Sequence, residues 1–271
     1  MNLFLLQCSY VAQQACSGNH VSYVLPLVIV CIIYLLYLAA ALKQEKRSRS
    51  YKRIIFFTIG CALLVISFSP PVADYAHHHF TGHTIQHLLL AMLAPLGLVL
   101  GAPVTLALRT LPVPAAGAIS KLLRSPFFHF ISHPVTALLL NIGGMFCLYL
   151  TPLYNLMHED NLVHALVHFH FFAAGYLFIW SIAGPDPAPR RPKMLLRTTV
   201  LFLSMAAHAY LSKFMYAYSY PKTSLHSEAA IKEGAKWMYY GGDVAELLLV
   251  IALFALWYNR SGKPYYRFSA S

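Results

Sequence analysis

Seven long apolar stretches alternate with short polar connections along the chain and predict membrane-spanning helices. The stretches cover residues 22–42, 53–69, 83–108, 134–150, 162–183, 194–217 and 238–258. A hydrocarbon core needs roughly 20 helical residues to be crossed. The apolar residues run continuously instead of alternating, which argues against a transmembrane β-barrel. The pattern predicts an all-α polytopic membrane protein with a seven-transmembrane helix bundle.

The connections between the stretches have no room for a soluble domain, so we expect residues 1–271 to form a single seven-helix membrane domain. Residues 115–131 (AAGAISKLLRSPFFHFI) place apolar residues on one face with basic residues beside them. They predict one short interfacial helix. Residues 184–193 (GPDPAPRRPK) predict a proline-stiffened turn, and Pro95 predicts a kink in the third stretch.

Basic residues are concentrated in every second connection, which predicts the orientation. Sixteen of the 20 lysines and arginines lie on one predicted side of the membrane. They occupy the connections 43–53, 109–133, 184–197 and the tail after residue 258. Because basic loops stay in the cytoplasm, we expect the N-terminus outside and the C-terminus in the cytoplasm. The expected location is a bacterial inner membrane.

The overall composition agrees with a membrane protein and argues against other classes. Hydrophobic residues make up 58% of the chain and charged residues 11%, whereas soluble domains carry about 25% charged residues. The net charge of +11 reflects the topology, and no nucleic-acid-binding module is recognisable. The first residues, MNLFLLQCSY, lack a basic n-region and do not predict a signal peptide. Cys8 and Cys16 would lie outside, where a disulfide can form.

Histidines provide the first functional signal, because two pairs recur at one predicted depth. His83 and His87 begin the third stretch, and His164 and His168 begin the fifth. Residues at i and i+4 share a helix face one turn apart. With a rise of about 1.5 Å per residue, His87 and His168 lie roughly 10 Å inside the outer boundary. The two pairs are therefore able to converge.

The sixth and seventh stretches bring further ionisable residues to the same level. Such residues are costly in a membrane and usually mark a function or a pairing. We therefore predict a metal site in the outer half of the membrane. Its candidate residues are His83, His87, His164, His168, His208, Asp243 and Glu246.

The remaining histidines are expected to have ordinary roles. His170 points to another helix face, and His129 and His133 form an i, i+4 pair on the opposite side of the membrane. Loops tolerate histidine, so the loop histidines are left outside the predicted site. They are His77, His78, His79, His158 and His226.

The ligand types leave the metal open. Imidazole and carboxylate suit Cu(II), Zn(II) or iron, whereas thioethers favour Cu(I). Met92 and Met157 lie near the histidines in the sequence. A carboxylate can also orient a histidine without touching the metal. The sequence does not decide which residues bind directly.

The sequence around the first histidine pair resembles a known family. Residues 83–90 (HTIQHLLL), 94–96 (APL) and 100–103 (LGAP) are similar to the HMxQHLLL…APPLL…LGAP signature of the CtaG family of cytochrome c oxidase assembly factors. The similarity covers about residues 55–260. Weaker landmarks of that family follow the signature. They are Leu111-Pro112, His133-Pro134, residues 164–168 (HALVH) and residues 240–243 (YGGD). Thr84 and Ile85 replace the family's methionine-containing step, which removes a soft ligand beside His83.

The resemblance implies a function in the maturation of haem–copper oxidase, by helping to insert or retain copper. Copper is the expected metal, with zinc as the alternative. The implied partners are cytochrome c oxidase subunits, membrane lipids and periplasmic copper chaperones, and nucleic acid is not expected. The implied role is that of a chaperone and not of an enzyme.

Two other function classes compete with this interpretation. A zinc-dependent seven-span hydrolase, similar to ceramidases or adiponectin receptors, also gathers histidines and an aspartate around a metal. The usual orientation of those enzymes is opposite to the one predicted for this chain. A haem b protein needs one histidine from each of two facing helices and ranks last. The sequence shows no nucleophile motif beside the histidines, which favours a non-enzymatic role.

Overall fold

The computed structural model describes residues 20–44, 50–188, 191–223 and 225–261. Throughout these ranges the regular structure is helical, with no strand. The N-terminal residues considered for a signal peptide, with Cys8 and Cys16, lie outside them.

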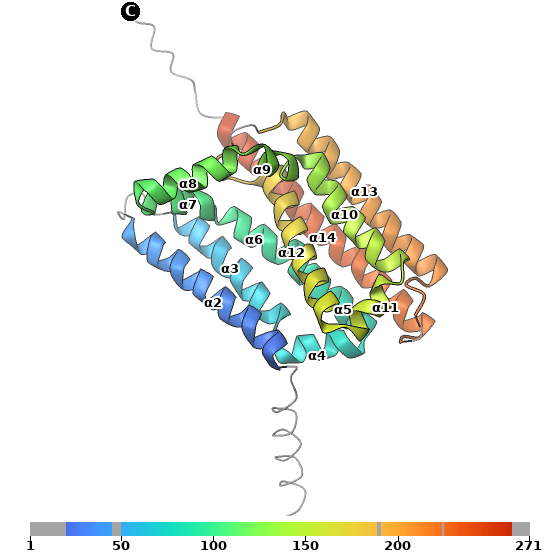
Figure 1. The fold of residues 1–271 in the computed structure, drawn as a ribbon. Coiled ribbons are helices and arrows are strands. Elements are labelled where there is room, and N and C mark those ends of the chain that lie inside the picture. Colours follow the sequence, from blue (N-terminus) through green and yellow to red (C-terminus); the bar gives the residue numbers. More distant parts are fainter. Residues whose placement is uncertain (1–19, 45–49, 189–190, 224, 262–271) are drawn as a thin grey trace, which may run out of the picture.

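Figure 1 shows helices packed side by side into a bundle, with short helices at both ends. The first elements are α2 (His20–Lys43), α3 (Tyr51–Ser67), α4 (Pro70–His78), α5 (Phe80–His87), the π-helix η1 (Leu88–Leu93), α6 (Ala94–Leu100) and α7 (Pro103–Thr110). They are followed by α8 (Val113–Arg124), α9 (Pro126–Ile131), α10 (Pro134–Leu150), α11 (Leu153–Glu159), α12 (Asn161–Ala183), α13 (Met194–Tyr218) and α14 (Glu228–Ser261).

The long helices follow the predicted apolar stretches closely. Five segments are long and apolar enough to cross a membrane by themselves: Val24–Lys43, Phe80–Thr110, Asn161–Ala183, Met194–Tyr218 and Glu228–Asn259. Two further crossings require a bent pair to act as one span. The pair α3 and α4 is bent by 54°, and the pair α10 and α11 by 79°. The protein is therefore a multi-pass membrane protein with five to seven candidate spans.

Three predicted connections differ from their sequence-based description. The connections 70–82 and 151–161, which hold the predicted loop histidines His77, His78, His79 and His158, contain the helices α4 and α11. In α4 the cause is local, since proline suits the first helical turn, where no N–H is needed. Residues 115–131 form two helices, α8 and α9, instead of one. Pro126 has no N–H to continue α8, and Ser125 caps α9 by accepting a hydrogen bond from the Phe128 N–H (3.1 Å).

The third stretch, in which Pro95 predicts a kink, contains π-helical turns just before that proline. The Ala94 N–H donates to the carbonyl of Leu89, five residues earlier. Pro95 itself has no N–H with which to continue the α-helical ladder. π-Helical turns often accompany functional sites, and this one begins directly after His87.

One half of the core joins α2, α3 and α6. A Cβ added at Gly97 would lie 2.7 Å from the backbone nitrogen of Gly60, so α3 and α6 touch through their backbones. Tyr37 of α2 stacks on Phe57 and donates a hydrogen bond to the Gly101 carbonyl (2.8 Å). These contacts fix the position of the helix that carries His83 and His87.

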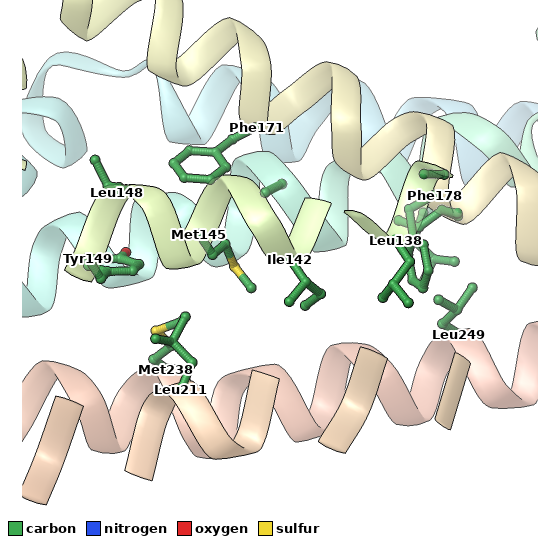
Figure 2. Packing of buried hydrophobic residues seen from close by; sticks show 14 of the residues in the cluster. Leu138, Ile142, Met145, Leu148, Tyr149, Phe171, Phe178, Leu211, Met238 and Leu249 are labelled. Carbon is green, nitrogen blue, oxygen red and sulfur yellow. The ribbon is translucent and has the colours of Figure 1, made fainter. Parts of the chain in front are cut away.

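The other half of the core lies between α10, α12, α13 and α14. Leu138, Ile142 and Met145 lie along one face of α10 and point toward the side chains of the neighbouring helices (Figure 2). Leu211 of α13 and Met238 of α14 are fully buried in this cluster. Packing of this kind holds α10, α12, α13 and α14 in a fixed register.

A buried carboxylate joins the α12–α13 turn to α7. Asp186 is 1% exposed and accepts hydrogen bonds from the backbone of Val104 (3.3 Å) and from the backbone and hydroxyl of Thr105 (2.7 and 2.6 Å). These donors belong to the first turn of α7, where the helix dipole favours an anion. The proline-stiffened turn predicted at 184–193 is thereby anchored to the bundle.

The bundle has two chemically different ends (Figure 1). We call the end with α4, α5, α11 and the start of α12 the histidine end, because His77, His83, His158 and His164 lie there. We call the end with α7, α8, α9 and the 184–193 turn the basic end, because Arg109, Lys121, Arg124 and Arg191 lie there. The separation agrees with the charge asymmetry of the sequence.

The orientation of the two ends is testable with topology reporters. A reporter that is active only outside the cytoplasm should work when it is fused after Asp160 and should fail after Lys193, because basic loops resist translocation. Activities of paired alkaline phosphatase and β-galactosidase fusions measure this directly. The reverse pattern would place the histidine end in the cytoplasm.

Candidate metal centre

The first group of predicted residues surrounds His83 at the histidine end. His83 is 3% exposed, and its ring packs edge-on against Tyr154, with centroids 5.3 Å apart, and against Tyr149, at 6.0 Å. The ring of His158, on α11, lies 6.5 Å from that of His83. Aromatic rings therefore hold the His83 imidazole in place inside the bundle.

The second histidine pair approaches the first from α12. The rings of His164 and His168 are 4.2 Å apart, and both interact electrostatically with His83. Asp160 caps α12 by accepting hydrogen bonds from the Leu162 N–H (2.7 Å) and the Val163 N–H (3.3 Å). That cap fixes the first residue of α12 and therefore the position of His164 and His168 along the axis of the bundle. The structure brings the two predicted pairs into one region.

His226, in the connection before α14, and His77, on α4, also belong to this first group, which we call the outer group. The hydroxyl of Tyr154 and Nε2 of His226 share a hydrogen bond of 3.0 Å. Burial, with a smaller effect of His79, lowers the pKa of His226, which favours its neutral, metal-binding form. His77 lies beside His158, with ring centroids 5.4 Å apart, and is exposed.

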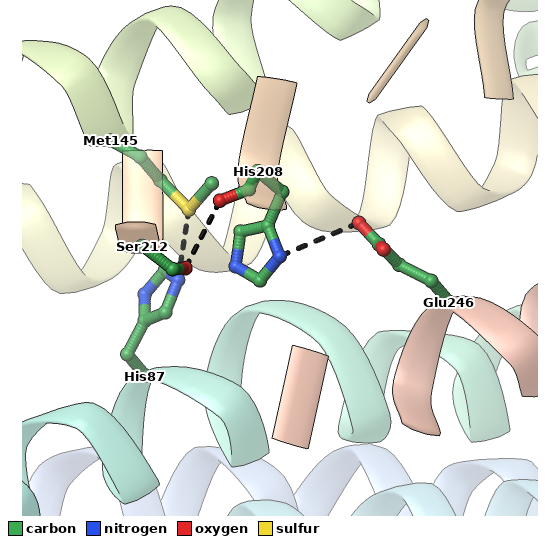
Figure 3. Close-up of polar contacts among 5 residues, drawn as sticks. All are labelled: His87, Met145, His208, Ser212 and Glu246. Carbon is green, nitrogen blue, oxygen red and sulfur yellow. Dashed lines mark hydrogen bonds and ion pairs between the residues drawn. The ribbon is translucent and has the colours of Figure 1, made fainter. Parts of the chain in front are cut away.

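A second, inner group forms around His87 (Figure 3). Nε2 of His87 lies 3.0 Å from Sδ of Met145, on α10. On the other side, Nδ1 of His208 lies 3.5 Å from a carboxylate oxygen of Glu246. His87, His208 and Glu246 are 3%, 1% and 4% exposed. Four helices thus contribute one side chain each to a buried polar group.

A small cavity connects the members of the inner group. It has a volume of about 20 Å³ and is lined by His87, Met145, His208 and Glu246, together with Met92 and Asn141. A cavity of this size holds about one water-sized sphere. It therefore suits a single ion or water and has no room for an organic substrate.

Gly242, which directly precedes Asp243, lies against the ring of His208. A Cβ added at Gly242 would lie 2.6 Å from Nδ1 of His208, so only glycine leaves room for that ring. Glu246 points inward toward His208, whereas Asp243 is exposed. Of the two carboxylates predicted for the site, the structure brings Glu246 to the histidines and leaves Asp243 on the outer surface.

Alanine at position 242 should therefore disturb the inner group. Gly242→Ala is expected to destabilise the protein by about 1–3 kcal/mol, because the added methyl overpacks the His208 ring. Gly143→Ala is the matched control, since a Cβ there meets no atom within 4 Å. Thermal unfolding in detergent measures both variants. Equal midpoints for the two would show that the His208 ring has room to move.

The structure also places Met145, His158 and His226 beside the predicted residues, although the sequence indicated ordinary roles for the two histidines and gave no role to Met145. The signal for Met145 was present: α10 runs toward the histidine end, and Met145 lies five residues before its last residue, Leu150, at a depth comparable to that of His87. His158 and His226 carried no such signal, because His158 lies on the short helix α11 and His226 in an irregular connection, and the sequence does not show how either segment packs.

Several buried nitrogens in both groups have no hydrogen-bond partner within the described protein. They are Nε2 of His83, Nδ1 of His87, Nε2 of His158 and Nε2 of His208. An unpaired buried polar group costs about 1–3 kcal/mol, and a neutral imidazole nitrogen is a metal ligand. Within the described ranges, however, no three His, Cys, Asp or Glu side chains surround a common point as ligands of one ion. The geometry instead offers nitrogens singly and in pairs.

Comparison with known proteins gives one family and several relatives. The sequence model of the cytochrome c oxidase caa3 assembly factor family matches residues 34–260. Uncharacterized proteins of Mycobacterium bovis and Mycobacterium tuberculosis are each 39% identical over 178 residues, which is 63% of this chain and 27% of theirs. An uncharacterized protein of Mycobacterium leprae is 32% identical over 226 residues, 76% of this chain and 34% of its own. The chain thus spans about a quarter to a third of these relatives, and no solved structure matches it.

Proposed function

Because the chain belongs to the cytochrome c oxidase caa3 assembly factor family, we propose that it receives copper at the histidine end and passes it on to the oxidase. Copper is the cargo in this proposal and not a resident cofactor. The oxidase subunit that accepts it is the partner, and the protein is a metal-handling chaperone in a bacterial inner membrane.

The observation that supports this proposal most is the pairing of His87 with Met145. An imidazole nitrogen and a thioether sulfur lie 3.0 Å apart at the edge of a cavity with room for one ion. Thioether ligands select Cu(I) over harder ions. The sequence lacks the family's methionine beside His83, and Met145 supplies a soft donor from another helix.

The outer group suits a role in uptake. The exposed His77 contacts His158, His158 contacts His83, and His87 follows His83 after one helical turn. A copper ion is able to move along such a series by exchanging one ligand for the next. The histidine nitrogens are available only singly and in pairs, so they bind the copper ion weakly. Weak binding allows its release to the oxidase, as delivery requires.

Glu246 and His208 have a separate part in this scheme. A carboxylate oxygen of Glu246 lies 3.5 Å from Nδ1 of His208, and Nε2 of His208 has no hydrogen-bond partner among the described residues. A carboxylate beside Nδ1 favours the tautomer that carries its proton there, which leaves the lone pair on Nε2. Such an orientation fixes the tautomer that binds a metal. The small cavity volume also favours an ion over the amide substrate that the alternative zinc hydrolase would need.

Copper and haem content of the oxidase in deletion membranes tests the proposal. Loss of this protein should leave oxidase subunits and haem in place while copper per oxidase and oxidase activity fall. Extra copper in the medium should restore part of the activity by mass action. Complementation with His77→Ala should be nearly complete although His77 begins the series, because His78 and His79 adjoin it and are able to replace it.

The competing functions give different results in the same membranes. Normal copper occupancy with normal activity would contradict the assembly role. A change in a lipid or amide pool with unchanged oxidase copper would identify a hydrolase.

A further inference from the structure

A cavity at the basic end is not used by the proposed function. It has a volume of about 550 Å³ and lies between α8, α9, the end of α12 and the connections that precede α10 and α13. This volume lies in the range of small-molecule sites, about 300–1,000 Å³. The helices that line it, α8 and α9, lie at the opposite end of the bundle from the histidine end (Figure 1).

The polar side of this cavity consists of hydrogen-bond donors. Arg124, His129, His133 and Arg191 line it, and the described lining includes no Asp or Glu. Arg191 donates a hydrogen bond to the Asp186 carbonyl (2.6 Å), so the buried Asp186 positions this guanidinium at the cavity. Nδ1 of His133 accepts a hydrogen bond from the Val135 N–H (3.4 Å), which leaves the Nε2–H of the neutral ring as a donor. These groups together favour an anion.

The other side of the cavity is apolar and interfacial. Trp180 is buried and packs edge-on against Phe128, with centroids 5.5 Å apart, and Leu123 lies beside them. Outside the cavity, Phe127 and Phe130 of α9 are 70% and 66% exposed. Short helices with exposed aromatic residues and basic neighbours lie at the membrane interface. A ligand that enters here therefore needs both an anionic group and an apolar part.

We propose that this cavity binds the phosphate ester of an anionic phospholipid headgroup, with Arg124, Arg191 and the two histidines around the phosphate. Guanidinium groups match phosphate oxygens in geometry and charge. The acyl chains then extend past α8 and α9 into the bilayer. The site anchors the basic end to an anionic leaflet and is independent of copper handling at the other end.

Fluorescence of Trp180 in the full-length chain reports on this site. The chain has three tryptophans, so Trp237→Phe and Trp257→Phe leave Trp180 as the single reporter. Short-chain phosphatidylglycerol should saturate the signal at a concentration about 25-fold lower than phosphatidylcholine, given about fivefold for each of Arg124 and Arg191. Inorganic phosphate, as the soluble source of the same chemistry, should act only at far higher concentration.

Substitutions separate the cavity from general surface charge. Arg124→Gln should weaken phosphatidylglycerol about fivefold, and His129→Asn should weaken it in the same direction. Lys121→Gln is the matched control, since Lys121 lies on the same helix, is exposed and does not line the cavity. Equal response to both lipids, or equal loss with Lys121→Gln and Arg124→Gln, would overturn the proposal. Inorganic phosphate acting at the phosphatidylglycerol concentration would overturn the lipid assignment.

Discussion

Replacing His87 or His168 with alanine is expected to lower the copper affinity of the purified protein by about 10- to 100-fold. Both imidazoles lie in the buried groups of the histidine end, and each is 8% exposed or less. Removing one deletes a nitrogen donor or the residue that holds a neighbouring donor in place. Competition with a Cu(I)-binding dye in detergent measures the effect.

The control for these two variants lies at the other end of the bundle. His129→Ala should leave the copper affinity unchanged, because His129 lines the cavity at the basic end. Helical content and detergent monodispersity of all three variants should equal those of the unaltered protein. Equal loss of copper affinity in all three variants would indicate that general misfolding, and not the loss of a metal ligand, causes the effect.

Replacing Met145 with leucine is expected to weaken Cu(I) binding about tenfold or more while leaving Zn(II) binding nearly unchanged. The thioether is a soft ligand that Cu(I) prefers and that Zn(II) does not need. Leucine has nearly the volume of methionine, so the packing of the buried cluster changes little. Parallel titrations with the two metals give the ratio of affinities.

Met215→Leu is the matched control for Met145→Leu. Met215 is fully buried in the same core but does not line the cavity beside His87. Its replacement should leave both affinities unchanged. A Met145→Leu variant that keeps its Cu(I) affinity, or that loses both metals equally, would show that Met145 acts only in packing.

The sequence determined the features that depend on local interactions along the chain, namely the helices and the faces they present. A membrane crossing needs a continuous apolar run of set length, and the runs at 162–183 and 194–217 therefore agree with α12 and α13 to within one residue at each end. The i, i+4 spacing placed His83 with His87 and His164 with His168 on common faces, since helix geometry is local. The family signature around His83 was likewise readable from the chain.

The tertiary structure decided which side chains meet. Glu246 and Asp243 are three residues apart on α14, and only helix packing determined that Glu246 faces His208 while Asp243 faces outward. Met145 reaches His87 across 58 positions of the chain, and His226 reaches Tyr154 across 72. Such contacts depend on the register between neighbouring helices. The pattern of apolar residues along one helix does not determine that register. The apolar pattern thus determined the helices and their approximate depth, whereas side-chain packing between distant helices determined the partners of each histidine.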